Sequence, residues 1–406
     1  MGHLVIFNTW GLISTFGVFQ THYTSTAASS PGLEPSAVAW IGSTQMLLHF
    51  SLGLFSGRAL DAGHFHWAVV PGVLLAPLGM FLTSLCTSYT YWQLFLAQGV
   101  LTGVGCGLQF SPCISLVATY FARNRSVALA IVSTGSATGG LVYPTVARQL
   151  LPRIGFAWTV RCMAFMMLGV GALYAALLRP RLPPRKSGPV VEVAALRELP
   201  YALFLLGVFL MGLGQFFAFY YIGTYAIEVV GVSYGTSVNL LLLMNGVGVV
   251  GRLVPAYVAD RWCGPFNTVV PSGFAAGVLL YAWTGVRTLG GLYAFSVVYG
   301  ICIAGFMGMF PVALTSLTKD LQKVGVRNGM GFGIIGLGSL IGPPIAGALI
   351  QRNGHGDGDA GTRYVSAQVW GASMVIAGSA VLLAARITIT GEVGEKEQLS
   401  SMRWDE

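Results

Sequence analysis

The chain of 406 residues is 54% hydrophobic and only 9% charged, and its mean hydropathy is +0.71. A soluble globular chain carries about 25% charged residues, so too few charges remain here to cover a surface that faces water. This composition excludes an ordinary cytosolic enzyme and predicts a protein that lies mostly in lipid. The net charge of +8 does not indicate nucleic-acid binding, because the basic cytosolic loops of a multi-pass membrane protein account for it.

Twelve apolar segments follow one another along the chain, separated by short stretches rich in glycine, proline or charge. An α-helix needs about 20 apolar residues to cross a bilayer, and twelve such helices with short loops use nearly the whole chain. We therefore predict an all-α integral membrane protein without a separate soluble domain. Its spans are residues 4–23, 37–55, 67–86, 92–121, 127–150, 156–178, 201–225, 235–258, 266–285, 292–317, 329–350 and 364–384.

A basic, proline-rich stretch that begins at Arg179 separates the first six spans from the last six. We predict one six-helix half over residues 1–178, a cytosolic linker over 179–200, a second half over 201–386 and a short cytosolic tail over 387–406. Of the 22 Lys and Arg residues, 16 fall in one set of alternate loops and 5 in the other, with one inside a span. The positive-inside rule then predicts that both termini are cytosolic, and the plasma membrane is the expected location.

Three landmarks recur in the two halves at one common offset of 199 residues. An aspartate ends the second and eighth spans (Asp61 and Asp260), and a proline lies late in the fourth and tenth (Pro112 and Pro311). Another proline lies in the fifth and eleventh spans (Pro144 and Pro343). One offset shared by three landmarks predicts an internal duplication. Two related halves that face one another are typical of a secondary transporter whose substrate site lies between them, near the middle of the membrane.

Two related motifs lie at the cytosolic ends of the second and eighth spans. The first reads Gly57-Arg-Ala-Leu-Asp61-Ala-Gly63, and the second runs from Gly251-Arg252 to Asp260-Arg261. Glycine lets two helices approach closely, and a carboxylate can lie at the N-terminal end of a neighbouring helix and pair with an arginine. We predict that Gly57, Asp61, Gly251, Asp260 and Arg261 form a conformational latch. A plain helix end with an arginine that extends to the membrane surface is the alternative.

These motifs resemble the Gly-x-x-x-Asp-(Arg/Lys) loop of the major facilitator superfamily. Within it, the chain resembles the fungal branch of the monocarboxylate-transporter family through Phe7-Asn-Thr-Trp-Gly11, Trp40-Ile-Gly-Ser-Thr-Gln45 and Thr134-Gly-Ser-Ala-Thr-Gly-Gly140. The resemblance covers most of the membrane region. It implies the major facilitator fold, alternating access between two halves, and a small organic substrate such as a monocarboxylate, a fungal secondary metabolite or a vitamin-like compound.

The chain departs from its animal relatives at the residues that the resemblance makes their proton and carboxylate site. They carry an Asp one helical turn before the Arg of the eighth span, whereas this chain keeps Arg252 but has Gly248 four residues earlier. A lysine of their first span is also missing, since no lysine precedes Lys186. Residues that usually precede the Phe7 segment are missing too, which leaves the first span at the short limit for crossing a bilayer.

Few titratable side chains fall inside the predicted spans. The 14 acidic residues all lie in loops, in tails or at span ends, so no carboxylate is available at mid-membrane for a proton relay. His49 lies mid-span with Gln45 one turn earlier on the same face, and its imidazole could exchange a proton. Arg161 and Arg252 could attract an anionic substrate. The alternatives are a histidine bonded between packed helices, an Arg161 that extends to the outer interface, and an Arg252 that serves only the latch.

Further polar and aromatic side chains should lie at the depth of a central cavity, where hydrogen bonds can orient a ring or a carbonyl group. These are Gln109, Tyr143, Gln215, Tyr220 and Asn245, which complete a predicted substrate site with Gln45, His49, Arg161 and Arg252. Positions that only pack or face lipid are the alternative for each. The neighbouring Phe216, Phe217 and Phe219 indicate room for a substrate with apolar bulk.

No catalytic motif is present, and the six cysteines form neither a CxxC pair nor a metal-binding spacing, so no enzyme activity, cofactor or metal is expected. We predict a secondary active transporter, for uptake or efflux, whose partners are a small molecule and the lipid bilayer. The sequence leaves open whether this molecule is anionic and whether its transport is coupled to protons. A non-transporting nutrient sensor on a transporter fold and a channel are the alternatives. The short linker and tail disfavour a sensor, and the duplication with its latches disfavours an open pore.

Overall fold

The computed structural model describes residues 1–26, 33–61, 63–86, 90–120, 131–180, 191–318, 323–353 and 360–402. The regular secondary structure of these residues is helical throughout, as the all-α expectation requires. The elements are α1 (Gly2–Ser14), α2 (Phe16–Thr26), α3 (Pro35–Asp61), α4 (Phe65–Thr83), α5 (Tyr91–Leu94), η2 (Phe95–Leu101), α6 (Thr102–Tyr120), α8 (Gly135–Leu177), η3 (Val193–Arg197), α9 (Leu199–Gly214), α10 (Phe217–Val230), α11 (Tyr234–Val258), η4 (Ala259–Cys263), α12 (Phe266–Trp283), α13 (Leu289–Ser316), α14 (Val324–Asn353) and α15 (Ala360–Met402).

Among the described residues, ten helical segments are long and apolar enough to cross a membrane. One of them, Ile131–Leu177, holds two of the predicted spans, because Gly155 breaks α8 with a φ of 75°, a backbone conformation that favours glycine. α3 is not one of the ten, but it is 27 residues long and packs against α6 and α14. Helices therefore stand at all twelve places where the sequence predicts a span.

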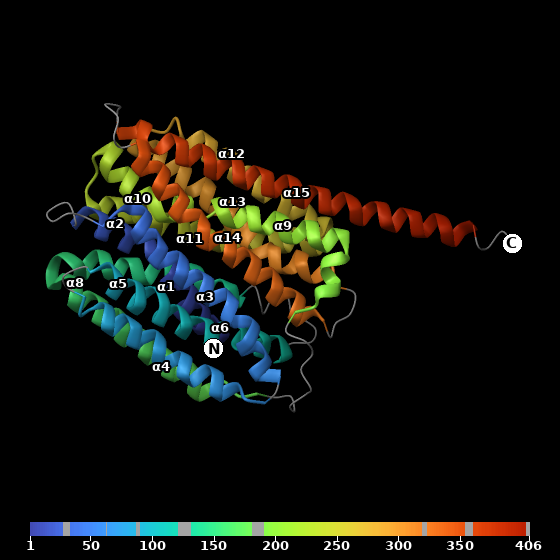
Figure 1. The fold of residues 1–406 in the computed structure, drawn as a ribbon, viewed down its shortest axis with the longest axis horizontal. Coiled ribbons are helices and arrows are strands. Elements are labelled where there is room, and N and C mark those ends of the chain that lie inside the picture. The colour runs from blue at the N-terminus through green and yellow to red at the C-terminus, as the bar shows by residue number, and fades with distance from the viewer. Residues whose placement is uncertain are drawn as a thin grey trace.

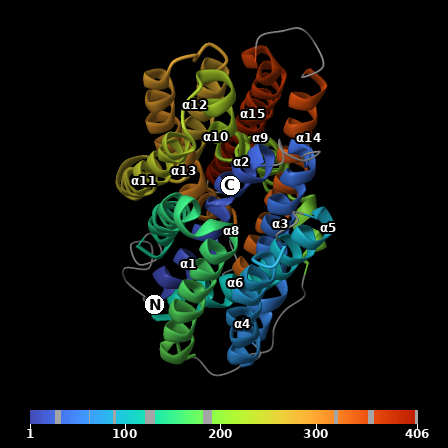
Figure 2. The same cartoon turned by 90° about the vertical axis from the view of Figure 1, so that its left-hand side faces the viewer.

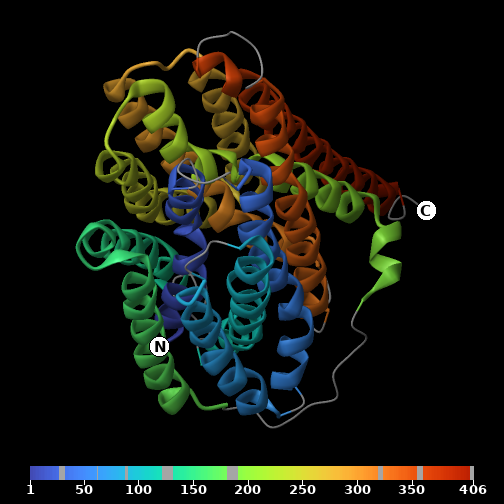
Figure 3. The same cartoon turned by 60° about the vertical axis from the view of Figure 1, so that its left-hand side comes forward.

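The helices gather into two groups, which Figure 1 shows below (blue to green) and above (yellow-green to red). In the N-terminal group α1 packs on α8, and α6 packs on α3 and α4. In the C-terminal group α11 packs on α13, and α15 packs on α9 and α12. The two groups meet where α3 contacts α14, α8 contacts α11 and α2 contacts α10, and Figures 2 and 3 show this arrangement from other sides.

The first and seventh spans are interrupted at corresponding places. α1 stops at Ser14 and α2 starts at Phe16, while α9 stops at Gly214 and α10 starts at Phe217. In the first span, Ser14 and Thr15 each donate a hydrogen bond to the carbonyl oxygen four residues earlier, an interaction that often bends helices. Both interruptions therefore lie near mid-span, at the interface between the two groups.

Glycine allows the closest helix crossings. A Cβ atom on Gly11 of α1 would lie 2.5 Å from the Cα atom of Gly139 in α8, so the two backbones touch with no room for a side chain. Small residues at such crossings are typical of membrane helices, where dispersion contacts between backbones replace the hydrophobic effect. This crossing fixes α1, and with it one wall of the space between the two groups.

Candidate functional site

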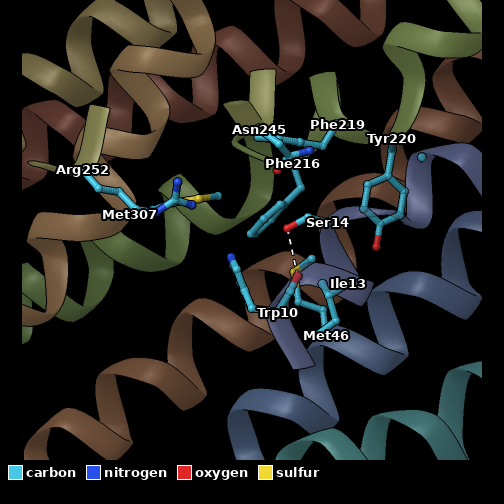
Figure 4. Close-up of a pocket in the computed structure, with 11 residues that line it drawn as sticks. Trp10, Ile13, Ser14, Met46, Phe216, Phe219, Tyr220, Asn245, Arg252 and Met307 are labelled. Carbon is cyan, nitrogen blue, oxygen red and sulfur yellow. Dashed lines mark hydrogen bonds between the residues drawn. The ribbon is translucent and has the colours of Figure 1, made fainter. Parts of the chain in front are cut away.

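A small cavity lies between the two groups of helices, beside the interruptions of the first and seventh spans (Figure 4). Both groups line it, with Trp10, Ile13, Ser14, Gly17 and Met46 on one side and Phe216, Phe219, Tyr220, Asn245, Arg252 and Met307 on the other. Its volume of about 20 Å³ is little more than one water molecule needs. A larger ligand therefore requires the two groups to move apart.

Among the described residues that line this cavity, Arg252 is the one with a charged side chain. Only 8% of it is exposed, and its Nη1 atom donates a hydrogen bond of 3.0 Å to the carbonyl oxygen of Gly248. No carboxylate among the described residues forms an ion pair with it. A buried cation without a counter-ion is costly, so such a residue is a candidate for binding an anion that arrives from outside the protein.

The Arg252 guanidinium group also occupies the space beside Gly248, the position at which the animal relatives carry an aspartate. A Cβ atom at that position would lie 2.7 Å from Nη1 of Arg252 and 3.4 Å from the Cβ atom of Ala304. The arginine thus fills the space in which an acidic side chain is expected from the animal relatives. Without that acid, the donors of Arg252 stay available to a ligand in the cavity.

Tyr220 and Asn245 are two further predicted residues that line the cavity. The Tyr220 hydroxyl is buried without a hydrogen-bond partner among the described residues, and its ring packs on Phe16 with 5.1 Å between centroids. Asn245 donates a hydrogen bond of 3.0 Å from Nδ2 to the carbonyl oxygen of Leu241. Its Oδ1 atom faces Gly140 of α8 so closely that a Cβ atom there would be 2.5 Å away. Asn245 therefore lies both in the cavity and at the contact between the groups.

The remaining walls are aromatic or thioether side chains. Trp10 contacts Phe216 edge to face at 6.2 Å between ring centroids, and Phe216 lies 6.4 Å from Phe219. Met46 comes from the N-terminal group and Met307 from the C-terminal group, and Figure 4 draws both in the cavity lining. Rings and flexible thioethers adapt to a bulky apolar ligand. Sequence reasoning placed Phe216 and Phe219 near the substrate but missed Trp10, although it lies in the motif that carries the family resemblance.

Three predicted residues lie outside the lining of this cavity, with unsatisfied polar atoms. His49 is fully buried, with its ring 5.5 Å from Trp10 and 4.2 Å from Phe110, and neither ring nitrogen has a hydrogen-bond partner among the described residues. The same holds for Nε2 of Gln45 and for both side-chain polar atoms of Gln215. Buried polar groups are normally hydrogen-bonded, so these atoms are candidates for hydrogen bonds to water or to a ligand.

Gln109 and Tyr143 are engaged inside the N-terminal group. Nε2 of Gln109 donates to the carbonyl oxygen of Gly105 at 2.8 Å, and its Oε1 atom accepts a hydrogen bond from the Tyr174 hydroxyl. Tyr143 donates a hydrogen bond of 2.9 Å to Oδ1 of Asn8. These bonds join α6 and α1 to the two parts of α8, so both residues act as packing groups in this conformation.

Arg161 lies away from the cavity as well. Its Nε atom donates a hydrogen bond of 3.1 Å to the Ser84 hydroxyl, and its guanidinium group sits 4.8 Å from the ring centroid of Trp158. The bond to Ser84 lies just after α4, on the outer part of the N-terminal group. Of the two predicted anion-attracting arginines, the structure brings only Arg252 to the central cavity.

The predicted latch is described in part. Gly57 and Asp61 stand at the end of α3, but the surroundings of Gly57 and the side chain of Asp61 lie outside what the structure describes. In the second motif a Cβ atom on Gly251 would lie 2.4 Å from the carbonyl oxygen of Ile301, so this glycine lets α11 pack closely on α13. Asp260 and Arg261 of η4 are exposed, and neither takes part in an ion pair among the described residues.

The two groups also meet at the end of the molecule where α2 and α10 finish, which is the predicted external end. The hydroxyl oxygens of Thr21 and Thr224 are 3.4 Å apart, and the Ser36 hydroxyl of α3 donates a hydrogen bond of 2.9 Å to the carbonyl oxygen of Pro344 in α14. On the other side of the cavity, Phe332 of α14 packs on Phe50 at 5.5 Å between centroids. Hydroxyl and backbone contacts therefore join the two groups at one end, and aromatic side chains join them on the other side of the cavity.

Known proteins share this sequence over nearly its whole length. The profile of the Major Facilitator Superfamily matches residues 2–288. An MFS-type transporter of Gibberella zeae is 39% identical over 388 residues, which cover 95% of this chain and 85% of that protein. In Emericella nidulans, the MFS-type transporter dbaD is 35% identical over 354 residues (87% of this chain, 79% of that protein), and the aspyridones efflux protein apdF is 33% identical over 392 residues (96% and 77%). The chain, all-helical and with a cavity between two groups of helices, thus belongs to the major facilitator superfamily and is a multi-pass membrane transporter of small molecules.

Proposed function

We propose that this transporter exports an acidic, partly aromatic secondary metabolite from the cytosol across the plasma membrane, with Arg252 as the ligand of its anionic group. The observation that carries the proposal is the buried guanidinium group in the cavity, which has no carboxylate partner among the described residues. The name of one relative, an aspyridones efflux protein, supports export of a metabolite. The proposal places the chain in the monocarboxylate-porter branch and both termini in the cytosol.

The chemistry of the lining supports this class of substrate. A carboxylate or enolate can accept two parallel hydrogen bonds from a guanidinium group, and such charge-assisted bonds are roughly twice as strong as neutral ones. The rings of Trp10 and Phe216 and the thioethers of Met46 and Met307 suit apolar bulk attached to that anion. The Tyr220 hydroxyl, which has no partner among the described residues, suits a carbonyl or hydroxyl group.

Proton coupling, if the export uses it, is assigned to His49. This side chain packs against Trp10 of the cavity wall, and a histidine that is exposed to water can exchange a proton near neutral pH. Its ring is fully buried here, so proton exchange would follow the opening of the cavity. A His49→Gln variant should then transport at a rate that no longer depends on an imposed pH gradient.

Uptake into proteoliposomes tests the proposal. Radiolabelled 1-naphthoate represents a bulky aromatic acid, and acetate represents a small one. The Arg252→Gln variant should lose affinity for naphthoate by about 10- to 150-fold, the equivalent of one hydrogen bond to a charged group. Arg161→Gln is the matched control, because it removes an intramembrane arginine that bonds Ser84 outside the cavity. Equal transport by wild type and Arg252→Gln would refute the role of Arg252, and no transport of any acid would favour a sensor.

A further inference from the structure

The two halves of the chain repeat one helix crossing, which matches residues of one half with residues of the other. α3 packs on α6 through three successive turns, and α11 packs on α13 in the same way. A Cβ atom on the glycine of each pair would lie within 3.4 Å of its partner, and the pairs are Gln45 with Gly103, His49 with Gly107 and Gly53 with Ser111 in the first half, and Met244 with Gly300, Gly248 with Ala304 and Arg252 with Gly308 in the second. Residues of α3 and α11 in corresponding pairs are 199 residues apart, the offset of the three landmarks. His49 is therefore the counterpart of Gly248, and Gly53 is the counterpart of Arg252.

This correspondence gives each half one large polar side chain and one glycine at the same two positions. In the second half the polar group belongs to Arg252 and the glycine stands one turn earlier, whereas in the first half the polar group belongs to His49 and the glycine stands one turn later. Gln45 adds an amide one turn before His49 on the same face of α3. Arg252 lines the central cavity from the C-terminal group, so the matching site of the N-terminal group should face the same cavity from the opposite side.

A single aromatic ring stands between this polar pair, Gln45 and His49, and the central cavity. Trp10 lines the cavity, and its ring centroid lies 5.5 Å from that of His49 and 6.2 Å from that of Phe216 (Figure 4). Met46, the residue after Gln45, lines the cavity too. A ligand that moves the two groups apart and displaces the Trp10 ring would therefore reach the polar pair.

The polar pair keeps hydrogen-bonding atoms that no described residue satisfies. Gln45 is 2% exposed and His49 is fully buried, yet Nε2 of Gln45 and both ring nitrogens of His49 have no hydrogen-bond partner among the described residues. The imidazole lies beside the backbone of Cys106 in α6, but not in the geometry of a hydrogen bond. Burial of such groups costs free energy, and a few convergent polar groups beside an apolar cavity are typical of a ligand site.

We infer that Gln45 and His49 form a second substrate subsite, which hydrogen-bonds a hydroxyl or carbonyl group on the part of the substrate remote from its acidic group. A neutral imidazole has one donor and one acceptor, and an amide has both, so the pair suits a phenolic hydroxyl. The substrate is then an oxygenated aromatic acid that contacts both halves at once. The inference rests on the proposed function only for the acidic group at Arg252, and the polar pair acts on the other end of the ligand.

Three ligands separate the two subsites, in binding to the detergent-solubilised full chain at neutral pH. The compound 1-naphthoate carries the acid alone, 6-hydroxy-1-naphthoate carries the acid and a hydroxyl on the other ring, and 2-naphthol carries the hydroxyl alone. One net hydrogen bond is worth about 2- to 12-fold in affinity, so wild type should prefer the hydroxylated acid to naphthoate by that factor. His49→Phe and Gln45→Met should each lose this preference and bind naphthoate as wild type does.

Both variants should fold, which melting temperatures check. A phenylalanine at position 49 joins the rings of Trp10 and Phe110, and methionine is the residue that stands at the counterpart of Gln45. Gln368→Met is the matched control, because it removes a buried amide of α15 that has no partner among the described residues and is not in the cavity lining. This control should keep the preference for the hydroxylated acid.

The inference is overturned if wild type does not prefer the hydroxylated acid. It is also overturned if Tyr220→Phe abolishes the preference while His49→Phe keeps it, since the hydroxyl would then bind on the C-terminal side. The proposed function fails separately: if Arg252→Gln binds both acids as wild type does while His49→Phe weakens naphthol, the second subsite stands and the acid site does not.

Discussion

Replacement of Gly248 by aspartate should convert the open cation of the central cavity into an internal ion pair. The new Cβ atom would lie 2.7 Å from Nη1 of Arg252, so the flexible guanidinium end must shift, while 3.4 Å to the Cβ atom of Ala304 is tolerable contact. The new carboxylate would then compete with the substrate anion for the same donors. A hydrogen bond between charged groups contributes about 1.5–3 kcal/mol, which corresponds to an affinity about 10- to 150-fold weaker.

Asparagine at the same position is the matched control, since it has nearly the same volume and shape but no charge. Both variants displace the guanidinium group, so any loss that they share measures sterics alone. Binding of radiolabelled naphthoate to the detergent-solubilised protein gives the affinity. Size-exclusion profiles and melting temperatures show whether each variant is folded. The reasoning is refuted if Gly248→Asp and Gly248→Asn weaken naphthoate equally, or if neither weakens it.

Two further predictions concern the packing. Hydrogen bonds from Arg327 and, to a smaller extent, from Lys323 lower the pKa of Glu192 from 4.5 to about 2. Their contribution to stability is therefore complete above pH 4.5 and is lost as the pH falls towards 2. The difference in melting temperature between wild type and Glu192→Gln should be constant from pH 5 to pH 7 and shrink below pH 4, and a difference that does not vary with pH would contradict the assignment. Gly11→Leu places a side chain where only 2.5 Å separates its Cβ position from the Gly139 backbone. This overpacking should cost more than about 3 kcal/mol of folding free energy and abolish the monodisperse species on size exclusion. Normal expression of the variant would show that α1 and α8 cross elsewhere.

Much of the fold could be predicted from the sequence, because a spanning helix must be long and apolar whatever its neighbours are. The Gly155 break inside α8 falls between two predicted spans, where the apolar run pauses. The interruptions at Thr15 and Gln215 were not predicted, since the apolar runs continue through both without a proline. At the first interruption Ser14 and Thr15 bond back to the helix, and a hydropathy pattern does not record such bonds.

The site could be predicted only in part, for a related reason. In a membrane protein both the lipid-facing and the buried faces of a helix are apolar, so the sequence gives the depth of a polar residue but not its direction. Arg252, Tyr220 and Asn245 point into the cavity, whereas Gln109 and Tyr143, predicted to lie at similar depth, bond within the N-terminal group. Family resemblance identified Arg252. The sequence could not show, however, that the Arg252 guanidinium group itself fills the space beside Gly248.

The most direct test of alternating access is the accessibility of the central cavity when its predicted external end is locked. Thr21 and Thr224, whose hydroxyl oxygens are 3.4 Å apart, can be replaced by a cysteine pair, with Ser14→Cys as a reporter in the cavity and the native cysteines removed. Oxidation should abolish labelling of position 14 by a membrane-impermeant maleimide from the outside, leave labelling from the cytosolic side, and be reversed by reductant. Persistent labelling from outside in the oxidised protein would contradict alternating access about this cavity.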